Sequence, residues 1–292
     1  MNVIGNQCVV RREQGFEVFT LSNQEVELAV VPELGARIMS LKGLRTGREW
    51  FWHPVAGPTL FRNGLKDKFE GGPLVGMDEC LPTIAPCAWR DRNLPDHGEV
   101  WAAPWSVDSD AWERGLLRTS ISLKMSPFHF ERTIELQENE VQFTYLLNSH
   151  AASEELFLWA MHPLLRLEAG DQLELPTSTR ALLKEVSWIP SLAPAGLKNG
   201  CEKLFASSIT DGWAAIHNPK TGDFLQFEWE PTENNTLGLW LNRGGWHGHH
   251  HFALEPTNGQ PDSLRIAAQS KRCGVVAPHS AVSWQVCITV GK

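Results

Sequence analysis

Alternation of apolar and polar residues is the feature of this chain that most constrains its fold. Successive side chains of a β-strand point to opposite faces of a sheet, so a run with period two predicts a strand with one buried face. Turn signals rich in Asn, Gly and Pro separate several such runs, and windows with helical periodicity are scarce. We therefore expect strands over residues 26–31, 116–125, 130–136, 140–147, 213–217, 224–229, 237–241 and 282–290.

Strands at short spacing without intervening helices predict an all-β fold, a large antiparallel β-sandwich with few short helices. No segment repeats at the period of propellers or solenoids. The chain has 292 residues and no linker-like tract of Ser, Gly and Pro, so we expect a single domain over residues 1–292. Residues 50–104 are rich in Pro and Gly and alternate little, which is typical of a functional loop in a β domain.

The charge and hydropathy of the chain exclude several classes of partner. With 26 Lys and Arg against 34 Asp and Glu, the net charge is −8, so we expect no nucleic-acid partner. No apolar stretch approaches the ~18–20 residues of a membrane span, so we expect no membrane partner. The first residues lack an apolar segment after a basic one, which predicts a cytoplasmic protein whose six cysteines are reduced thiols.

Three candidate catalytic residues stand at strand ends or in the irregular segment. Glu255 follows three apolar residues and precedes a proline, His162 ends an apolar strand, and His97 lies within residues 50–104. Taken singly, a solvent-facing acid, a core histidine and a histidine in a turn are sufficient explanations. Together, a carboxylate that accepts a proton and two histidines that donate one or orient a ligand suit acid–base chemistry on a sugar. Neighbouring tryptophans, Trp240 among them, suit the C–H faces of a sugar ring.

Five segments, in a fixed order along the chain, resemble the galactose mutarotase (aldose 1-epimerase) superfamily. Residues 31–43 are similar to the first hairpin of that family, and residues 278–284 to its closing strand. The pair His97 and Gly98 resembles its first histidine site, and residues 161–163 resemble the segment with its second. Residues 253–256 resemble the segment that holds its essential glutamate. The resemblance implies a β-supersandwich with a sugar groove across one concave sheet.

The activity that this resemblance implies is the interconversion of the α and β anomers of a free sugar. Glu255 would be the general base that removes the proton from the anomeric hydroxyl, and His162 the general acid that protonates the ring oxygen. The ring opens to the aldehyde, the C1–C2 bond rotates, and closure gives the other anomer while His97 holds the sugar. A small-molecule sugar is then the expected partner, with no metal, nucleotide or other cofactor and no oligomeric state implied.

The sequence departs from the family pattern at groups that bind sugar hydroxyls. The family carries an arginine upstream of its first histidine, a role for which Arg62 and Arg90 both qualify. It also carries an aspartate between the second histidine and the glutamate, where Asp211 is better explained by a turn. Other acids could bind hydroxyls, or could equally lie behind the site or at the surface: Asp78, Glu79 and Glu99.

A histidine-rich run over residues 247–251 leaves two interpretations open. Alternate histidines on one face of a strand can bind Zn²⁺ or Ni²⁺, whereas a solvated loop after residues 243–245 needs no ligand. The metal interpretation supports a different acid–base isomerase or lyase acting on sugars. A second alternative is a carbohydrate-binding protein of the same fold without catalysis, although binding alone requires neither an acid nor a base.

Overall fold

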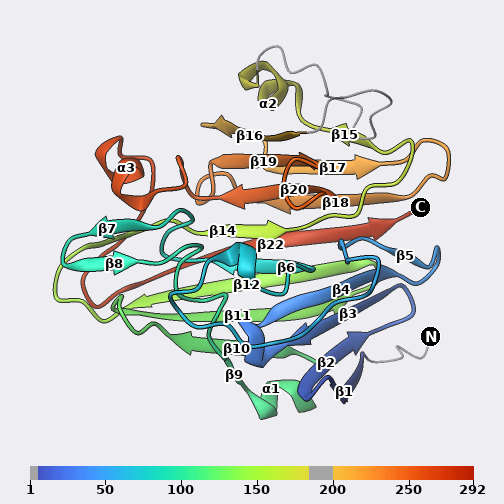
Figure 1. The fold of residues 1–292 in the computed structure, drawn as a ribbon, viewed down its shortest axis with the longest axis horizontal. Coiled ribbons are helices and arrows are strands. Elements are labelled where there is room, and N and C mark those ends of the chain that lie inside the picture. The colour runs from blue at the N-terminus through green and yellow to red at the C-terminus, as the bar shows by residue number, and fades with distance from the viewer. Residues whose placement is uncertain (1–5, 184–199) are drawn as a thin grey trace.

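Two large antiparallel sheets build the fold, in a computed structural model that describes residues 6–183 and 200–292 (Figure 1). In these residues the first sheet has ten strands, in the order β1(Gln7–Glu13), β2(Phe16–Ser22), β3(Val26–Val31), β4(Arg37–Gly43), β6(Met77–Cys80), β14(Ala160–Pro163), β20(His250–Thr257), β19(Thr236–Arg243) and β16(Gly200–Ser207), with β5(Arg48–Glu49) beside β4. The second sheet has eight, in the order β15(Gln172–Glu174), β17(Trp213–His217), β18(Phe224–Trp229), β22(Ala281–Gly291), β12(Glu140–Ser149), β11(Phe128–Gln137), β10(Leu117–Ser122) and β9(Ser106–Val107).

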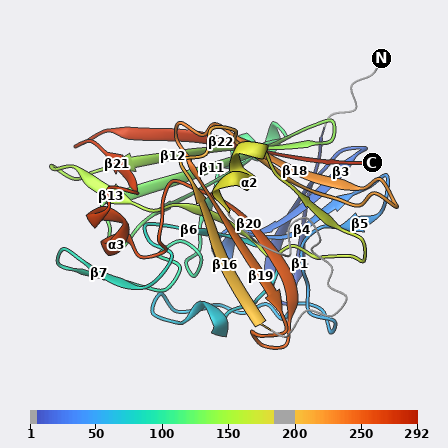
Figure 2. The same cartoon turned by 90° about the horizontal axis from the view of Figure 1, so that it is seen from above.

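Short elements complete the architecture in the described part of the chain. They are the ribbons β7(Cys87–Trp89) with β8(Arg92–Leu94) and β13(Glu155–Phe157) with β21(Gly274–Val276), the helices α1(Ser109–Glu113), α2(Thr177–Leu182) and α3(Leu264–Gln269), and the 3₁₀ helices η1(Pro32–Leu34) and η2(Phe69–Gly71). The prediction of an antiparallel all-β sandwich with few short helices is confirmed. Figure 2 shows its layers, with β12 and β22 in one and β19 and β20 in the other.

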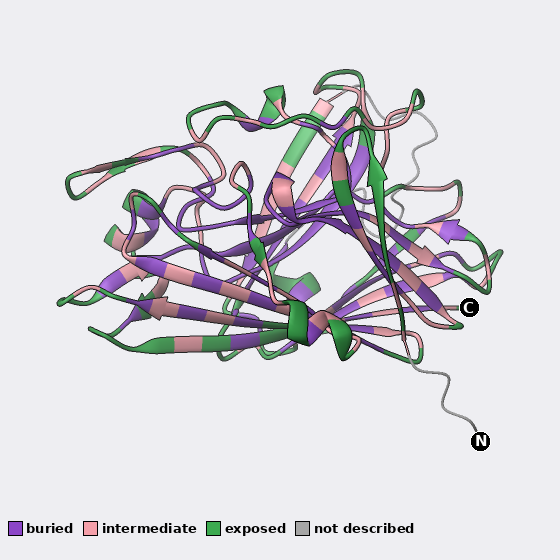
Figure 3. Ribbon diagram, turned by 90° about the horizontal axis from the view of Figure 1, so that it is seen from below, coloured by how far each residue is buried: buried purple, intermediate pink, exposed green. Residues whose placement is uncertain are grey.

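The second sheet shows how alternation creates the core. Along β11 and β12, every second residue is buried, among them Phe128, Phe130, Phe143 and Tyr145. These rings meet apolar side chains of the first sheet in one cluster between the layers. Figure 3 shows the same alternation as buried and less buried bands along the strands. The sequence pattern therefore fixes which face of each strand points inward.

The first sheet is covered on both faces where it carries the functional site. In β20, only the first residue is exposed. Phe252 and Leu254 pack in the core between the sheets, so Ala253 and Glu255 point to the opposite face. In β19, Leu239 belongs to the same core, and Trp240 points away from it. Loops from residues 50–104 lie over this outer face, and β6, β7 and β8 lie within that segment, which the sequence predicted to be largely irregular.

Candidate active site

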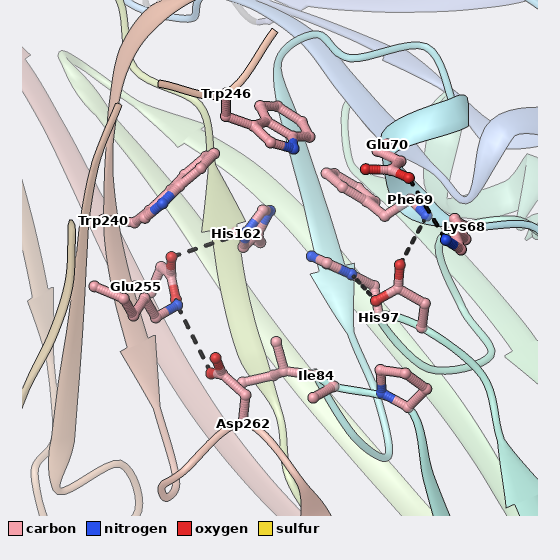
Figure 4. Close-up of a pocket in the computed structure, with 14 residues that line it drawn as sticks. Lys68, Phe69, Glu70, Ile84, His97, His162, Trp240, Trp246, Glu255 and Asp262 are labelled. Carbon is pink, nitrogen blue, oxygen red and sulfur yellow. Dashed lines mark hydrogen bonds and ion pairs between the residues drawn. The ribbon is translucent and has the colours of Figure 1, made fainter. Parts of the chain in front are cut away.

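A pocket of about 500 Å³ opens on the face of the first sheet that points away from the second sheet. Strands β14, β16, β19 and β20 contribute to it, together with η2 and the loop before Gly98. Four lining residues are among those that the sequence singled out: His97, His162, Trp240 and Glu255. In Figure 4, Glu255 and Trp240 lie on one side, His97 and Phe69 on the other, and His162 between them.

Strand pairing holds the two central groups. Met161 of β14 packs in the core, so His162 points to the pocket, as Glu255 does from β20. The Nε2 atom of His162 lies 3.8 Å from Oε1 of Glu255 (Figure 4). Glu255 is fully buried and His162 is 5% exposed. A proton donor and a proton acceptor are thus held side by side on adjacent strands.

The carboxylate of Glu255 uses its two oxygens differently. Lys203 Nζ donates to Oε2, whereas Oε1 has no hydrogen-bond partner among the described residues. Burial raises the pKa of Glu255, the ammonium of Lys203 lowers it, and the carboxylate of Asp262 raises it further. A buried carboxylate kept ionised by a lysine is a good proton acceptor. Glu255 therefore has the properties of a general base with one oxygen available to a ligand.

The imidazole of His162 is held in its neutral form. Burial places the pKa of His162 well below 6.5, and the nearby His97 and Lys203 lower it further. Its Nδ1 atom is buried and has no hydrogen-bond partner in the described part of the chain. A neutral imidazole that carries its proton on Nε2 can donate to a ligand oxygen placed beside Glu255.

His97 reaches the pocket from a loop that several contacts fix. Its backbone is left-handed, with φ of 56°, and its N–H donates to the Ile84 carbonyl at 2.7 Å. Its Nδ1 lies 2.9 Å from Asp96 Oδ1, and its ring stacks on Phe69 with centroids 4.0 Å apart. At Gly98, also left-handed, an added Cβ would lie 2.0 Å from a carbonyl oxygen of the neighbouring segment. The ring is therefore held before a ligand arrives.

Aromatic rings form much of the pocket wall. Trp240 of β19 and Trp246 of the β19–β20 hairpin meet edge to face, with centroids 5.4 Å apart and planes at 73°. Phe69 stands edge-on to the ring of His162 across the pocket, at 5.3 Å. Apolar walls with a few convergent polar groups are typical of sites for small ligands. The arrangement suits a compact ligand with both hydroxyl groups and C–H faces.

Solved structures of other proteins share this architecture. A galactose mutarotase-like protein from Clostridium acetobutylicum matches with a TM-score of 0.70 at 13% identity, over 99% of each chain. A candidate aldose 1-epimerase from Klebsiella pneumoniae matches at 0.74 and 16% identity, over 98% of this chain and 87% of that one. The chain has the galactose mutarotase-like fold. A Synechocystis protein matches at 0.73 and 16% identity, over 94% of this chain and 95% of that one. No family model matches the sequence, and no curated protein sequence is significantly similar to it.

Within this galactose mutarotase-like fold, neither candidate arginine lines the pocket formed by the described residues. Arg62 is mostly exposed and pairs with Glu33 of η1, and its guanidinium lies over the Phe16 ring. Arg90 pairs with Glu155 of β13. Arg62 was expected to bind a sugar hydroxyl, and the structure instead assigns it to the surface of the N-terminal strands.

Glu79 faces the core instead of the pocket, because consecutive residues of β6 point to opposite sides. Its carboxylate accepts hydrogen bonds from Tyr145 Oη and Trp159 Nε1, both at 2.9 Å, and from Arg132 Nη1 at 3.1 Å. All four side chains are buried. The expectation that Glu79 binds a hydroxyl is therefore replaced by a structural role that ties β6 to the second sheet.

Asp78 and Glu99 are not among the residues that line the pocket in the described structure. Asp78 is the cross-strand partner of His162 and pairs with Arg37 at 2.7 Å. Burial raises the pKa of Asp78 to about 6, against the opposing effect of Arg37. Glu99 is buried and accepts the backbone N–H of Met125 at 2.7 Å. Both acids were candidates for binding hydroxyls; in the structure Asp78 links β6 to β4, and Glu99 links the loop of His97 to Met125.

Sequence reasoning missed several lining residues, above all Lys203 and Asp262. Lys203 lies in β16, which the alternation did not indicate, and Asp262 lies in the turn before α3. Nζ of Lys203 is 3.7 Å from Asp262 Oδ1. Asp96 also lines the pocket, and it orients His97. A signal existed for Asp96, since the sequence places it directly before the candidate histidine.

The histidine-rich run combines exposed and buried rings. His247 is exposed and lies 3.9 Å from Glu70 at the pocket rim, and His249 packs on Trp52 with centroids 4.6 Å apart. His251 is fully buried, and burial lowers its pKa to about 3. The solvated-loop interpretation is therefore wrong for His251. Across the described residues, no group of three or more His, Cys, Asp or Glu side chains is arranged to hold a metal ion.

The helices that the structure describes are short, and none of them has the length and apolar character to cross a membrane.

Proposed function

We propose that this protein interconverts the α and β anomers of a free sugar by general acid–base ring opening, with residues 1–292 acting as one domain. The observation that carries the proposal is the pair of Glu255 and His162, 3.8 Å apart in a pocket of about 500 Å³. One oxygen of the buried base is without a hydrogen bond among the described residues, and the buried imidazole beside it is neutral. The fold shared with galactose mutarotase-like proteins supports the same reaction class.

The proposed reaction moves one proton at each end of the C1–O5 bond. Oε1 of Glu255 accepts the proton of the anomeric hydroxyl as the C1–O1 bond gains double-bond character. The C1–O5 bond breaks, and O5 receives the Nε2 proton of His162, whose neutral ring becomes an imidazolate until the proton returns. Neutral imidazoles serve as proton donors to ligand oxygens in other enzymes. Rotation about C1–C2 and the reverse proton transfers close the ring on the other face and restore both residues.

His97 and the tryptophans have proposed roles in holding the sugar. His97 lies across the pocket from Glu255, with its ring 4.9 Å from that of His162, so a ring bound between them places O5 near both imidazoles. Trp240 offers an apolar face to the C–H groups of the ring. We place the reaction in the cytoplasm, since none of the six cysteines, all of which are described, forms a disulfide.

The test is anomer exchange measured by two-dimensional exchange NMR, over a panel of aldoses and uronic acids. We expect accelerated exchange for at least one sugar, with a loss of ~10²–10⁴-fold in Glu255→Gln and in His162→Ala. Glu113→Gln, on an exposed residue at the end of α1, is the matched control and should exchange like the wild type.

Two other results would each change the proposal. Chemical-shift changes on sugar addition, without accelerated exchange for any sugar, would favour a carbohydrate-binding protein of the same fold. Accelerated exchange that survives in Glu255→Gln would remove Glu255 from the reaction and leave His162 without its proposed partner.

A further inference from the structure

Lys203 reaches Glu255 across an intervening strand. Strands β20, β19 and β16 are neighbours, with Glu255 opposite Gly238 and Gly238 opposite Phe205. Lys203 is two residues from Phe205, so both side chains point to the same face of the sheet. Its side chain crosses β19, and its ammonium donates to Oε2 of Glu255. The contact is thus a link between next-nearest strands at the floor of the pocket.

Gly238 makes this link possible. A Cβ added there would lie 2.9 Å from Oε2 of Glu255 and 3.2 Å from its Cβ. Any side chain would crowd the carboxylate oxygen that Lys203 holds. The glycine is therefore required by the close approach of the Glu255 side chain, and it has no left-handed backbone to accommodate.

The link assigns separate tasks to the carboxylate oxygens. Oε2 is held by Lys203, and Oε1 faces His162 without a hydrogen bond in the described structure. Asp262 holds the lysine from the other side, with Oδ1 3.7 Å from Nζ. The backbone carbonyl of Asp262 accepts hydrogen bonds from the N–H groups of Ile84 and Ala85, which fixes the turn in place.

We propose that Lys203 is a positioning residue for the reaction: it turns Oε1 of Glu255 toward the substrate and keeps the carboxylate ionised, while Asp262 limits that effect. This inference rests on the proposed function, because it names what prepares the base for that reaction. Lys203 touches the base and not the reacting atoms, so its effect is exerted through Glu255.

The charges around Glu255 determine the sign of each effect. Among the described residues, five titratable groups face Glu255: Lys203 from β16, His162 from β14, Cys80 from β6, Asp262 from the turn before α3, and His97 from its loop. Burial raises the pKa of Glu255, the positive charge of Lys203 lowers it, and the negative charge of Asp262 raises it. Removing Lys203 must therefore raise that pKa, and removing the charge of Asp262 must lower it.

The experiment compares pH profiles of kcat/KM for anomer exchange in Lys203→Met and Asp262→Asn. The acid limb of each profile is the range in which protonation of Glu255 lowers the rate. We expect this limb to move to higher pH in Lys203→Met and to lower pH in Asp262→Asn. Each unit of displacement changes the rate about tenfold at a pH on the limb. Lys203→Arg keeps the charge and should keep the limb within a fraction of a unit. Lys220→Met, on an exposed residue in the turn between β17 and β18, is the matched control and should leave the limb in place.

A second readout separates this inference from the proposed function. Carboxyl ¹³C NMR of glutamate-labelled protein, with Glu255→Gln to assign the signal, measures the titration of Glu255 without any sugar. If no sugar exchanges in the wild type, the proposed function fails, while the titration still decides whether Lys203 controls Glu255. If Lys203→Met does not fold, Asp262→Asn carries the test. An unmoved Glu255 titration in the folded variants, or shifts of the same sign in both, would overturn the inference.

Discussion

Replacement of Gly238 by alanine tests whether catalysis depends on the close approach of Glu255 to this glycine. The added Cβ would lie 2.9 Å from Oε2 of Glu255, against ~3.5–4.0 Å for an ordinary contact between heavy atoms. Relief of that overlap requires the carboxylate to move by roughly 0.5–1 Å. Because Glu255 is fully buried, it cannot swing into solvent, and the movement disturbs the contact of Oε2 with Lys203.

The size of the expected effect follows from this displacement. A misplacement of ~1 Å at a catalytic group costs about 10²-fold in rate. Overpacking of a buried site by one methyl group costs roughly 1–3 kcal/mol in the free energy of unfolding. We therefore expect Gly238→Ala to lose about two orders of magnitude in kcat, with a moderate loss of stability and a protein that still folds.

The assay is anomer exchange by NMR, together with unfolding in denaturant. Gly71→Ala is the matched control, since a Cβ there would meet nothing within 4 Å, and it should change neither quantity by much. Wild-type kcat in Gly238→Ala, with an unshifted acid limb, would refute the reasoning. It would mean that the contact between Lys203 and Glu255 tolerates a methyl group against the carboxylate.

Three further predictions concern stability and ligand binding. Arg132→Met should destabilise the fold by about 3–5 kcal/mol in denaturant unfolding, because it leaves the buried Glu79 without its cation; an unchanged midpoint would contradict this. His251 has a pKa of about 3 when folded against 6.5 when unfolded, so its neutral form stabilises above pH 6.5 and that contribution falls by about 1.4 kcal/mol per unit from pH 6.5 down to 3. His251→Gln should make the pH dependence of unfolding correspondingly shallower over that range, and an equal slope would count against the prediction. Trp240→Ala should raise KM roughly tenfold with little change in kcat, because it removes packing against substrate and transition state alike; a fall in kcat at unchanged KM would contradict it.

The sequence pattern predicted the long strands well and the short strands of the pocket sheet poorly. Strands β10, β11, β12 and β22 bury one face, so their alternation is visible in the residues. All four residues of β6 and all four of β14 are buried, because core lies on one side and loops on the other. Such strands show no alternation, and a short run of mixed residues does not reveal them.

The sequence predicted the site residues that stand in local motifs, and it missed those that strand order brings to the pocket. His97, His162 and Glu255 stand in short motifs and line one pocket. Lys203 gives no local signal, because lysines are common in strands. Its partner Glu255 lies in β20, which is separated from β16 by β19. Period two alone places Asp78 and Glu79 on opposite faces, so the sequence already contained the reason that both could not bind one ligand.

The position of β22 has a consequence for synthesis of the chain. This strand, residues Ala281–Gly291, pairs with β12 on one side and β18 on the other. In the sequence β12 ends at Ser149, far before β22 begins. Until residue 291 leaves the ribosome, β12 and β18 both present open edges that can pair with other chains. We infer that nascent chains ending before β22 are the species most prone to aggregation.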